Sequence, residues 1–127
     1  MRPIAVKDIM AKKLVTFKPD TKVIAAIQIL IKNRFSGAPV VNDKGELIGI
    51  LSEMDCMETV IHNSYYSESG GFVRDFMTTE LTTVNPEMGI VDLAQFFQEK
   101  HFRRLPVVKN GKLVGQVSRR DVLKAIQ

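Results

Sequence analysis

The pattern of residues 6–60 returns at residues 73–126, with a constant offset of 67 that falls to 66 after one deletion opposite Lys44. For example, Val-Lys-Asp-Ile-Met at 6–10 returns as Val-Arg-Asp-Phe-Met at 73–77. Copies of a tandem repeat bury their apolar faces against each other. The duplication therefore predicts two related halves about a pseudo-two-fold axis, each with its own version of any functional site.

The repeat also sets the expected domain organisation. A chain of 127 residues is the length of one domain. We expect a first repeat at 1–62, a linker at 63–72 and a second repeat at 73–127, together forming one compact module. The linker is polar and includes two adjacent glycines, a composition typical of turns.

The first half of each copy predicts a strand followed by a helix. In the first copy, an extended stretch at 14–17 precedes Pro19, which is expected to start the helix, with Asp20 at the positive end of the helix dipole. Apolar residues recur at three- and four-residue spacing from 21 to 33, which indicates a helix with one apolar face.

The second half of each copy predicts a β-hairpin and another helix. Two short apolar runs, 38–41 and 47–51, flank an Asn-Asp-Lys-Gly turn, and Ser52 then begins the next helix. The second copy has the same order. The sequence therefore predicts an α/β (α+β) fold made of two β-α-β-β-α repeats.

Charge and composition argue against several functional classes. The net charge is +4, but most Lys and Arg residues are interleaved with acidic residues, which is typical of a solvated surface rather than a nucleic-acid interface. No apolar run approaches the roughly 18 residues of a membrane span, and the first residues do not resemble a signal peptide. Since Cys56 is the only cysteine, no intrachain disulfide can form, and a cytoplasmic location is expected.

A Ser-x-x-Asp motif follows the second strand of each hairpin, as Ser52 with Asp55 and Ser118 with Asp121. A helix-capping box would by itself account for both pairs. Alternatively, free backbone N–H groups at the helix start suit a phosphate, and the carboxylate one turn later can accept both hydroxyls of a ribose. A sugar and a phosphate together indicate a nucleotide.

Two arginines distinguish the copies. Arg103 and Arg104 stand where the first copy has Ser36 and Gly37. Arginine binds phosphate through a planar fork of donors, although a pair of solvent-exposed arginines would explain each residue equally well. The two sites are therefore expected to differ, with arginine-assisted phosphate binding mainly in one of them or shared between the two repeats.

Taken together, the Asp-x-Met, Pro-Val-Val and Gly-x-x-Ser-x-x-Asp motifs, each present twice in register, resemble the CBS (cystathionine β-synthase) domain pair over nearly the whole chain. The resemblance implies two repeats packed sheet to sheet, two clefts between them, and a disc-shaped homodimer of pairs. It also implies a regulatory module that binds AMP, ADP, ATP, S-adenosylmethionine or a dinucleotide, in some cases with magnesium.

The resemblance assigns roles by position. It implies that Asp121 holds the ribose and Ser118 lies near the sugar or phosphate, and that Ser52 and Asp55 take these roles in the other cleft. The remaining implied contacts are to phosphate, from Arg103 and Arg104 with Ser36 across the seam, and to adenine, from Thr78 and Leu81.

Three functions remain open. The first is a non-catalytic energy-sensing module whose nucleotide shifts an equilibrium between dimer arrangements. The second is a dimerisation scaffold with empty clefts that regulates a separate protein. The third is an enzyme acting on a nucleotide, which lacks an evident catalytic base: His62 and His101 lie far apart in sequence, and Cys56 is expected in the core.

Overall fold

The computed structural model describes residues 3–62 and 71–127, and most of the linker predicted at 63–72 lies outside them. The chain forms two compact units. The first unit combines Met1–Leu14 with Thr82–Gln127, and the second is Val15–Leu81. The mixed helix and strand class is confirmed, with one two-stranded sheet in each unit.

The second unit holds the hairpin of the first repeat. Its elements, in chain order, are α2 (Val23–Asn33), β1 (Gly37–Val41), β2 (Leu47–Ser52), α3 (Glu53–His62) and α4 (Val73–Phe76). The antiparallel pair of β1 and β2 contributes Ala38, Val40 and Leu51 to a core that also includes Phe17 and residues of α2, α3 and α4.

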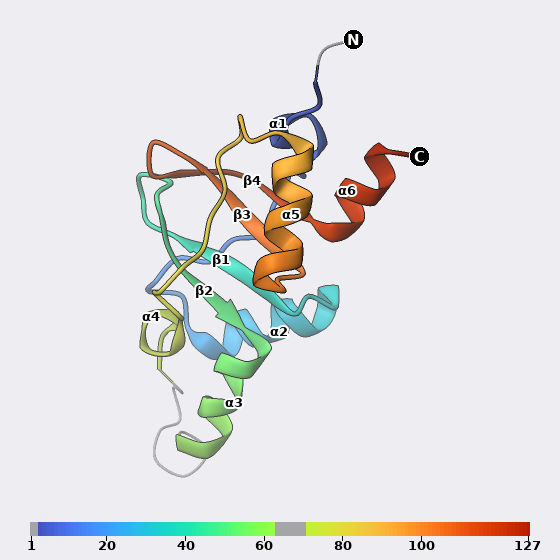
Figure 1. Ribbon diagram of the computed structural model, residues 1–127. Coiled ribbons are helices and arrows are strands. Elements are labelled where there is room, and N and C mark those ends of the chain that lie inside the picture. Colours follow the sequence, from blue (N-terminus) through green and yellow to red (C-terminus); the bar gives the residue numbers. More distant parts are fainter. Residues whose placement is uncertain (1–2, 63–70) are drawn as a thin grey trace. The chain divides into compact units, whose positions relative to one another are not determined.

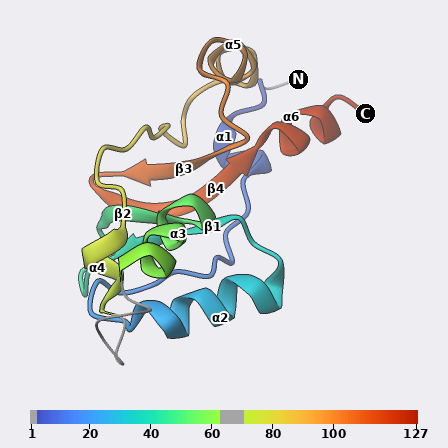
Figure 2. The same cartoon turned by 90° about the horizontal axis from the view of Figure 1, so that it is seen from below.

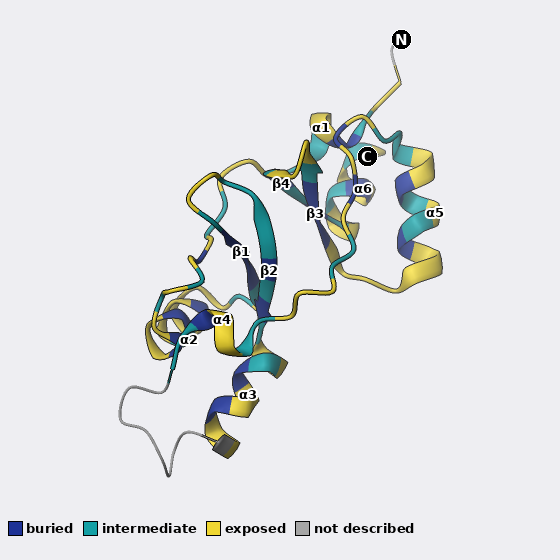
Figure 3. Ribbon diagram, turned by 90° about the vertical axis from the view of Figure 1, so that its left-hand side faces the viewer, coloured by how far each residue is buried: buried dark blue, intermediate teal, exposed yellow. Residues whose placement is uncertain are grey.

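The first unit has the same elements. They are α1 (Val6–Ile9), α5 (Ile90–Lys100), β3 (Arg104–Lys109), β4 (Lys112–Ser118) and α6 (Arg119–Ala125). Its core contains Leu93 and Phe97 from α5 and Leu105, Val107 and Val117 from the hairpin. Figure 3 shows the resulting burial on one face of α5 and exposure on the other.

Each short helix packs in the unit of the other repeat. Helix α1 precedes the first repeat's hairpin in sequence but contacts β4 and α6, while α4 contacts β2 and α3 (Figure 2). Backbone hydrogen bonds fix this exchange: Val6 N donates to Met88 O at 2.8 Å, and Val73 N donates to Thr21 O at 2.8 Å. The segments that follow α1 and α4 are thereby placed against the opposite copy's hairpin.

The start of α2 differs from the sequence prediction. Pro19 and Asp20 form a turn, and the helix begins only at Val23, with no acidic residue in its first turn. The backbone of residues 21–23 is instead used to bind the segment before α4, because Val23 N donates to Gly71 O at 3.1 Å and Thr21 O accepts from Val73. A tertiary contact therefore delays the helix.

The predicted first strand of each copy is present only as an isolated bridge. Phe17 pairs in parallel with Val40, and Val84 pairs in the same way with Val107. Phe17 donates to Pro39 O and accepts from Val41 N, both at 2.9 Å. A proline stands two residues further on in each copy, at 19 and 86, where it cannot donate to a ladder.

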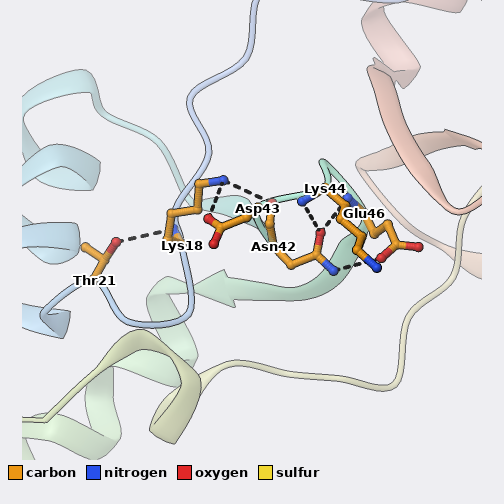
Figure 4. A network of polar contacts seen from close by, with 6 residues as sticks. All are labelled: Lys18, Thr21, Asn42, Asp43, Lys44 and Glu46. Carbon is orange, nitrogen blue, oxygen red and sulfur yellow. Dashed lines mark hydrogen bonds and ion pairs between the residues drawn. The ribbon is translucent and has the colours of Figure 1, made fainter.

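The two hairpin turns explain the one-residue deletion between the copies. In the first turn, the side-chain Oδ1 of Asn42 accepts from Lys44 N and Glu46 N, both at 3.0 Å, and Lys18 Nζ donates to Asn42 O at 3.0 Å (Figure 4). The second turn needs only Asn110 and Gly111, both at positive φ (54° and 81°). That geometry is the two-residue hairpin turn favoured by Asn-Gly.

Candidate functional site

The end of the hairpin and the start of the next helix have the same backbone arrangement in both units. In the second unit, Asp55 N donates to Ser52 Oγ at 3.1 Å, and Ser52 N donates to Asp55 Oδ2 at 2.8 Å. The first unit repeats both bonds between Ser118 and Asp121, at 3.2 and 2.8 Å. Both predicted capping boxes are thus formed, and each leaves the second carboxylate oxygen outside the cap.

The two sites differ in the hydrogen bonding of the second carboxylate oxygen of the aspartate. Asp55 Oδ1 accepts a hydrogen bond from Thr78 Oγ1 at 3.0 Å. The equivalent of Thr78 is Ala11, which has no donor in its side chain. Among the described residues no donor is bonded to Asp121 Oδ1, so this oxygen is free to accept from a ligand.

Thr78 and Ala11 reach these positions through a backbone pair with the second hairpin strand. Ile50 and Thr78 exchange N–H···O bonds of 2.9 and 2.8 Å, and Gln116 and Ala11 do so at 3.0 and 2.8 Å. Each pair follows one of the exchanged short helices. The side chain opposite each Asp is therefore set by the other repeat's sequence.

Methionine side chains fill the space over the glycines at the centre of the second strands. A Cβ on Gly49 would lie 2.6 Å from Met77 Sδ, and a Cβ on Gly115 would lie 2.6 Å from Met10 Sδ. Each glycine accommodates the methionine of an exchanged segment. The repeated methionines are thus packing residues over the hairpins.

Charge around the caps differs strongly between the units. In the first unit, Arg104 pairs with Ser118 across the hairpin, and Arg119 N donates to Arg103 O at 3.1 Å, so the backbone of these three arginines adjoins the Ser-Asp pair. The side chain of Arg119 lines a groove between α5 and α6. Arg120 adds a fourth at the start of α6. All four side chains are exposed, and the structure records no ion pair to them within the described part of the chain.

The equivalent positions of the second unit carry the opposite charge. Gly37 pairs with Ser52, and Glu53 N donates to Ser36 O at 2.8 Å. Ser36, Gly37, Glu53 and Met54 thus replace the four arginines, and the local sum changes from four positive charges to one negative charge. Sequence reasoning identified the first two replacements but missed Glu53 opposite Arg119, a difference that the repeat alignment already contains.

The predicted site residues fall into two groups. The first unit brings together Ser118, Asp121, Arg103 and Arg104, and the second brings together Ser36, Ser52, Asp55 and Thr78. Leu81 is half-buried and is the last residue of the second unit. The contribution of Ser36 to the arginine site, and the adenine contacts of Thr78 and Leu81, stay predictions.

Three further features of the described residues bear on metals, the membrane and thiol chemistry. No group of three or more His, Cys, Asp or Glu side chains suited to a metal occurs within residues 3–62 and 71–127. Across those ranges, none of the helices has the length and apolar character needed to cross a membrane. Cys56 is buried, as predicted, and burial together with Asp55 and Glu53 raises the pKa of its thiol.

Comparison with known proteins identifies the class that this duplicated hairpin-and-helix arrangement defines. The sequence profile of the CBS domain matches residues 6–62 and again residues 73–127. The chain therefore belongs to the CBS domain family and carries two copies of the domain, as the sequence motifs predicted.

Relatives and solved structures agree with this assignment. An uncharacterised protein of Methanocaldococcus jannaschii is 32% identical over 95% of this chain and 90% of its own length. The chloroplastic CBS domain-containing protein CBSX1 of Arabidopsis thaliana is 31% identical, with 94% of this chain and 63% of CBSX1 aligned. A crystal structure of CBSX2 in complex with AMP is 32% identical, with a TM-score of 0.82 over 96% of this chain and 95% of that chain.

Proposed function

We propose that this chain is a non-catalytic regulatory module that binds an adenosine nucleotide such as AMP, ADP or ATP. The observation that carries the proposal is the carboxylate of Asp121. One of its oxygens is held by the backbone of Ser118 at 2.8 Å, while the other has no donor among the described residues. A carboxylate fixed in this way can accept both hydroxyls of a ribose without reorganising.

The arginines supply the second half of the proposed recognition. The backbone of Arg103 and Arg104 lies beside the same cap, and guanidinium groups bind phosphate with bidentate geometry. A ligand with a vicinal diol and a phosphate fits this set of donors and acceptors. The similarity to CBSX2, which was crystallised with AMP, supports adenosine as the nucleoside. Magnesium would enter only with the phosphates of ADP or ATP, to which it binds directly.

Thermal melting against a panel of AMP, ADP, ATP, S-adenosylmethionine, NAD and GTP at about 1 mM tests the proposal. A ligand present at 100 times its dissociation constant stabilises the folded state by about 2.7 kcal/mol, which is several degrees for a domain of this size. Adenosine compounds should raise the melting temperature and GTP should not. A flat panel, with and without magnesium, would overturn the proposal.

A second candidate, association with another copy of the chain, has its own support. Helix α3 exposes Met54, Met57, Val60 and Ile61. In the first unit, a groove of about 510 Å³ runs between α5 and α6, lined by Ala94, Phe97, Gln98, His101, Arg119, Val122 and Leu123. Apolar faces of this kind mark interaction sites. We propose that they form a homodimer interface, whose arrangement the nucleotide shifts.

Sedimentation measures the dimer directly. Leu123 is 62% exposed, so Leu123→Glu should leave the fold intact and convert dimers to monomers. Val91→Glu, on the exposed face of α5 outside the groove, is the matched control. A monomeric wild-type protein at micromolar concentration would contradict the dimer. The proposal further places the chain in the cytoplasm, with a separate protein as the regulated partner.

A further inference from the structure

We infer that α3 of one copy of the chain packs against α6 of a second copy, in a contact whose two surfaces carry opposite charge. This contact rests on the homodimer proposed above and specifies which surfaces meet in it. Two observations carry it: the helices expose matching apolar residues, and the charges beside those residues are reversed between them.

The two helices occupy equivalent places in the two repeats and expose equivalent apolar side chains. Each begins directly after the second strand of a hairpin (Figure 1). Met57 and Val60 of α3 correspond to Leu123 of α6 and to Ile126 directly after it, and all four side chains are more than half exposed. Since residues three apart lie on the same face of a helix, each helix presents an apolar strip.

The charged residues along these strips have opposite signs. Glu53 corresponds to Arg119, and Glu58 corresponds to Lys124. In total, α3 has three acidic residues and no Lys or Arg, whereas α6 has three basic residues and one acidic residue. The net charge of the helix therefore changes from −3 to +2 between the repeats.

The basic side chains of α6 lie beside its apolar strip. Arg119 and Leu123 both line the groove between α5 and α6. Arg120 and Lys124 line a second hollow, again together with Leu123. No acidic residue is among the described residues that line either of them. Leu123 is therefore flanked by cations on both sides.

The acidic residues of α3 are placed in the same way. Glu53 lies one turn before Met57, and Glu58 lies one turn before Ile61, which is also exposed. The third carboxylate, that of Asp55, is held by the backbone of its cap. The apolar strip of α3 is thus bordered by two exposed carboxylates.

Charge decides between the two ways in which two copies can bring these helices together. If each helix met its own counterpart, carboxylates would face carboxylates and cations would face cations, which disfavours association. If α3 met α6, the same apolar strips would be buried and the flanking charges would attract. A two-fold dimer of this kind contains the contact twice.

The asymmetry extends over the whole of each unit. The first unit carries twelve Lys and Arg residues and five Asp and Glu residues, a net charge of +7. The second carries six and nine, a net charge of −3. Opposite charge on two surfaces speeds their encounter and penalises the like-charged alternative. Each unit therefore attracts the other kind of unit in a second copy.

Sedimentation of the full chain over a concentration series tests the contact by charge reversal. Glu53→Arg with Glu58→Lys gives α3 the charges of α6, and Arg119→Glu with Lys124→Glu does the opposite. Each double variant should raise the dimer dissociation constant at least about tenfold, because attraction becomes repulsion in both copies of the contact. A combined variant with all four changes exchanges the charges and should return to within about threefold of the wild type.

Controls separate this contact from misfolding and from net charge. Each new residue already stands at the equivalent position of the other repeat, so folding should be retained, which circular dichroism verifies. Asp20→Lys with Glu80→Lys is the matched control, because both residues are exposed and lie in the second unit outside α3. At about 0.15 M salt, screening limits charge effects to about 8 Å, so this control should leave the dissociation constant unchanged.

The wild-type chain gives a second reading without substitution. Raising the salt concentration from about 0.15 M to about 1 M should weaken the dimer, because it screens the attraction between α3 and α6. A dimer that tightens over this range would contradict the contact.

The outcomes separate the contact from the proposed function. Unchanged dissociation constants in both double variants, or a combined variant as weak as either of them, would overturn the contact and leave the homodimer standing. A wild-type chain that stays monomeric would overturn both. Nucleotide binding is measured separately, by the melting panel.

Discussion

The caps at Ser52 and Ser118 share a backbone and differ in almost every side chain around it. Both have the same pair of bonds between a serine and an aspartate one turn later. One cap adjoins the backbone of Arg103, Arg104 and Arg119, and the other adjoins the backbone of Ser36, Gly37 and Glu53. Because the backbone is the same, differences in what the two sites bind can be assigned to a few exposed side chains.

The exchange of the short helices adds a second difference. Thr78 and Ala11 enter the two sites from the segments that follow α4 and α1, so each site combines residues from both sequence repeats. A change in either repeat therefore affects one site through its cap and the other through the exchanged segment.

Substitution of the central glycines should have the largest effect on stability and should be unequal. A Cβ at Gly115 would lie 2.9 Å from the backbone oxygen of Ala11, whereas at Gly49 the nearest backbone oxygen, of Thr78, is 3.2 Å away. Met10 and Met77 can move, but backbone cannot move as easily. We expect Gly115→Ala to cost about 2 kcal/mol and Gly49→Ala about 1 kcal/mol in urea unfolding. Equal costs would contradict the packing described here.

Loss of the cap carboxylates should have a smaller effect, again unequal. Asp121→Ala removes one bond to the backbone and should cost about 1 kcal/mol. Asp55→Ala also removes the bond from Thr78 and should cost about 0.5 kcal/mol more. Thr78→Ala, measured alone and together with Asp55→Ala in a double-mutant cycle, isolates this bond. An absence of coupling would show that the bond contributes nothing.

The sequence predicts correctly those features whose signals lie close to them along the chain. The hairpins, the serine caps and the apolar face of α2 lie within a few residues of the signals that determine them, and all appear as predicted. The delayed start of α2 and the methionine over each glycine depend on contacts between segments about 30 to 105 residues apart. No pattern in a single sequence signals which hairpin a short helix will pack against.

Cys56, in the second unit, should make the free energy of unfolding depend weakly on pH. The first unit has no equivalent thiol, because the counterpart of Cys56 is Val122, which does not ionise. Burial and the nearby carboxylates raise the thiol pKa above the ordinary value of 9.0, so the unfolded chain releases this proton at lower pH than the folded one. This contribution is therefore full below pH 9 and is lost as pH rises through the folded pKa. Cys56→Val should flatten that part of a pH–stability profile, and an unchanged slope would contradict the shift.

The smallest effect is expected at the surface of the short helices. Lys7 Nζ lies 3.0 Å from Glu87 Oε2, and both side chains are about half exposed. In the second unit, the equivalent Arg74 lies over the ring of Phe72 instead, 4.4 Å from its centroid. Glu87→Gln should change the free energy of unfolding by about 0.3 kcal/mol, less at high salt. A change above about 1 kcal/mol would indicate a wider network than this pair.

The most direct test of the central claim compares AMP with its 2′,3′-dideoxy analogue by calorimetric titration of the wild-type chain. If Asp121 and Asp55 read the ribose diol, AMP should bind, and loss of both hydroxyls should weaken binding at least about tenfold. Equal affinity for the two compounds, or no binding of AMP to the folded protein, would contradict the account.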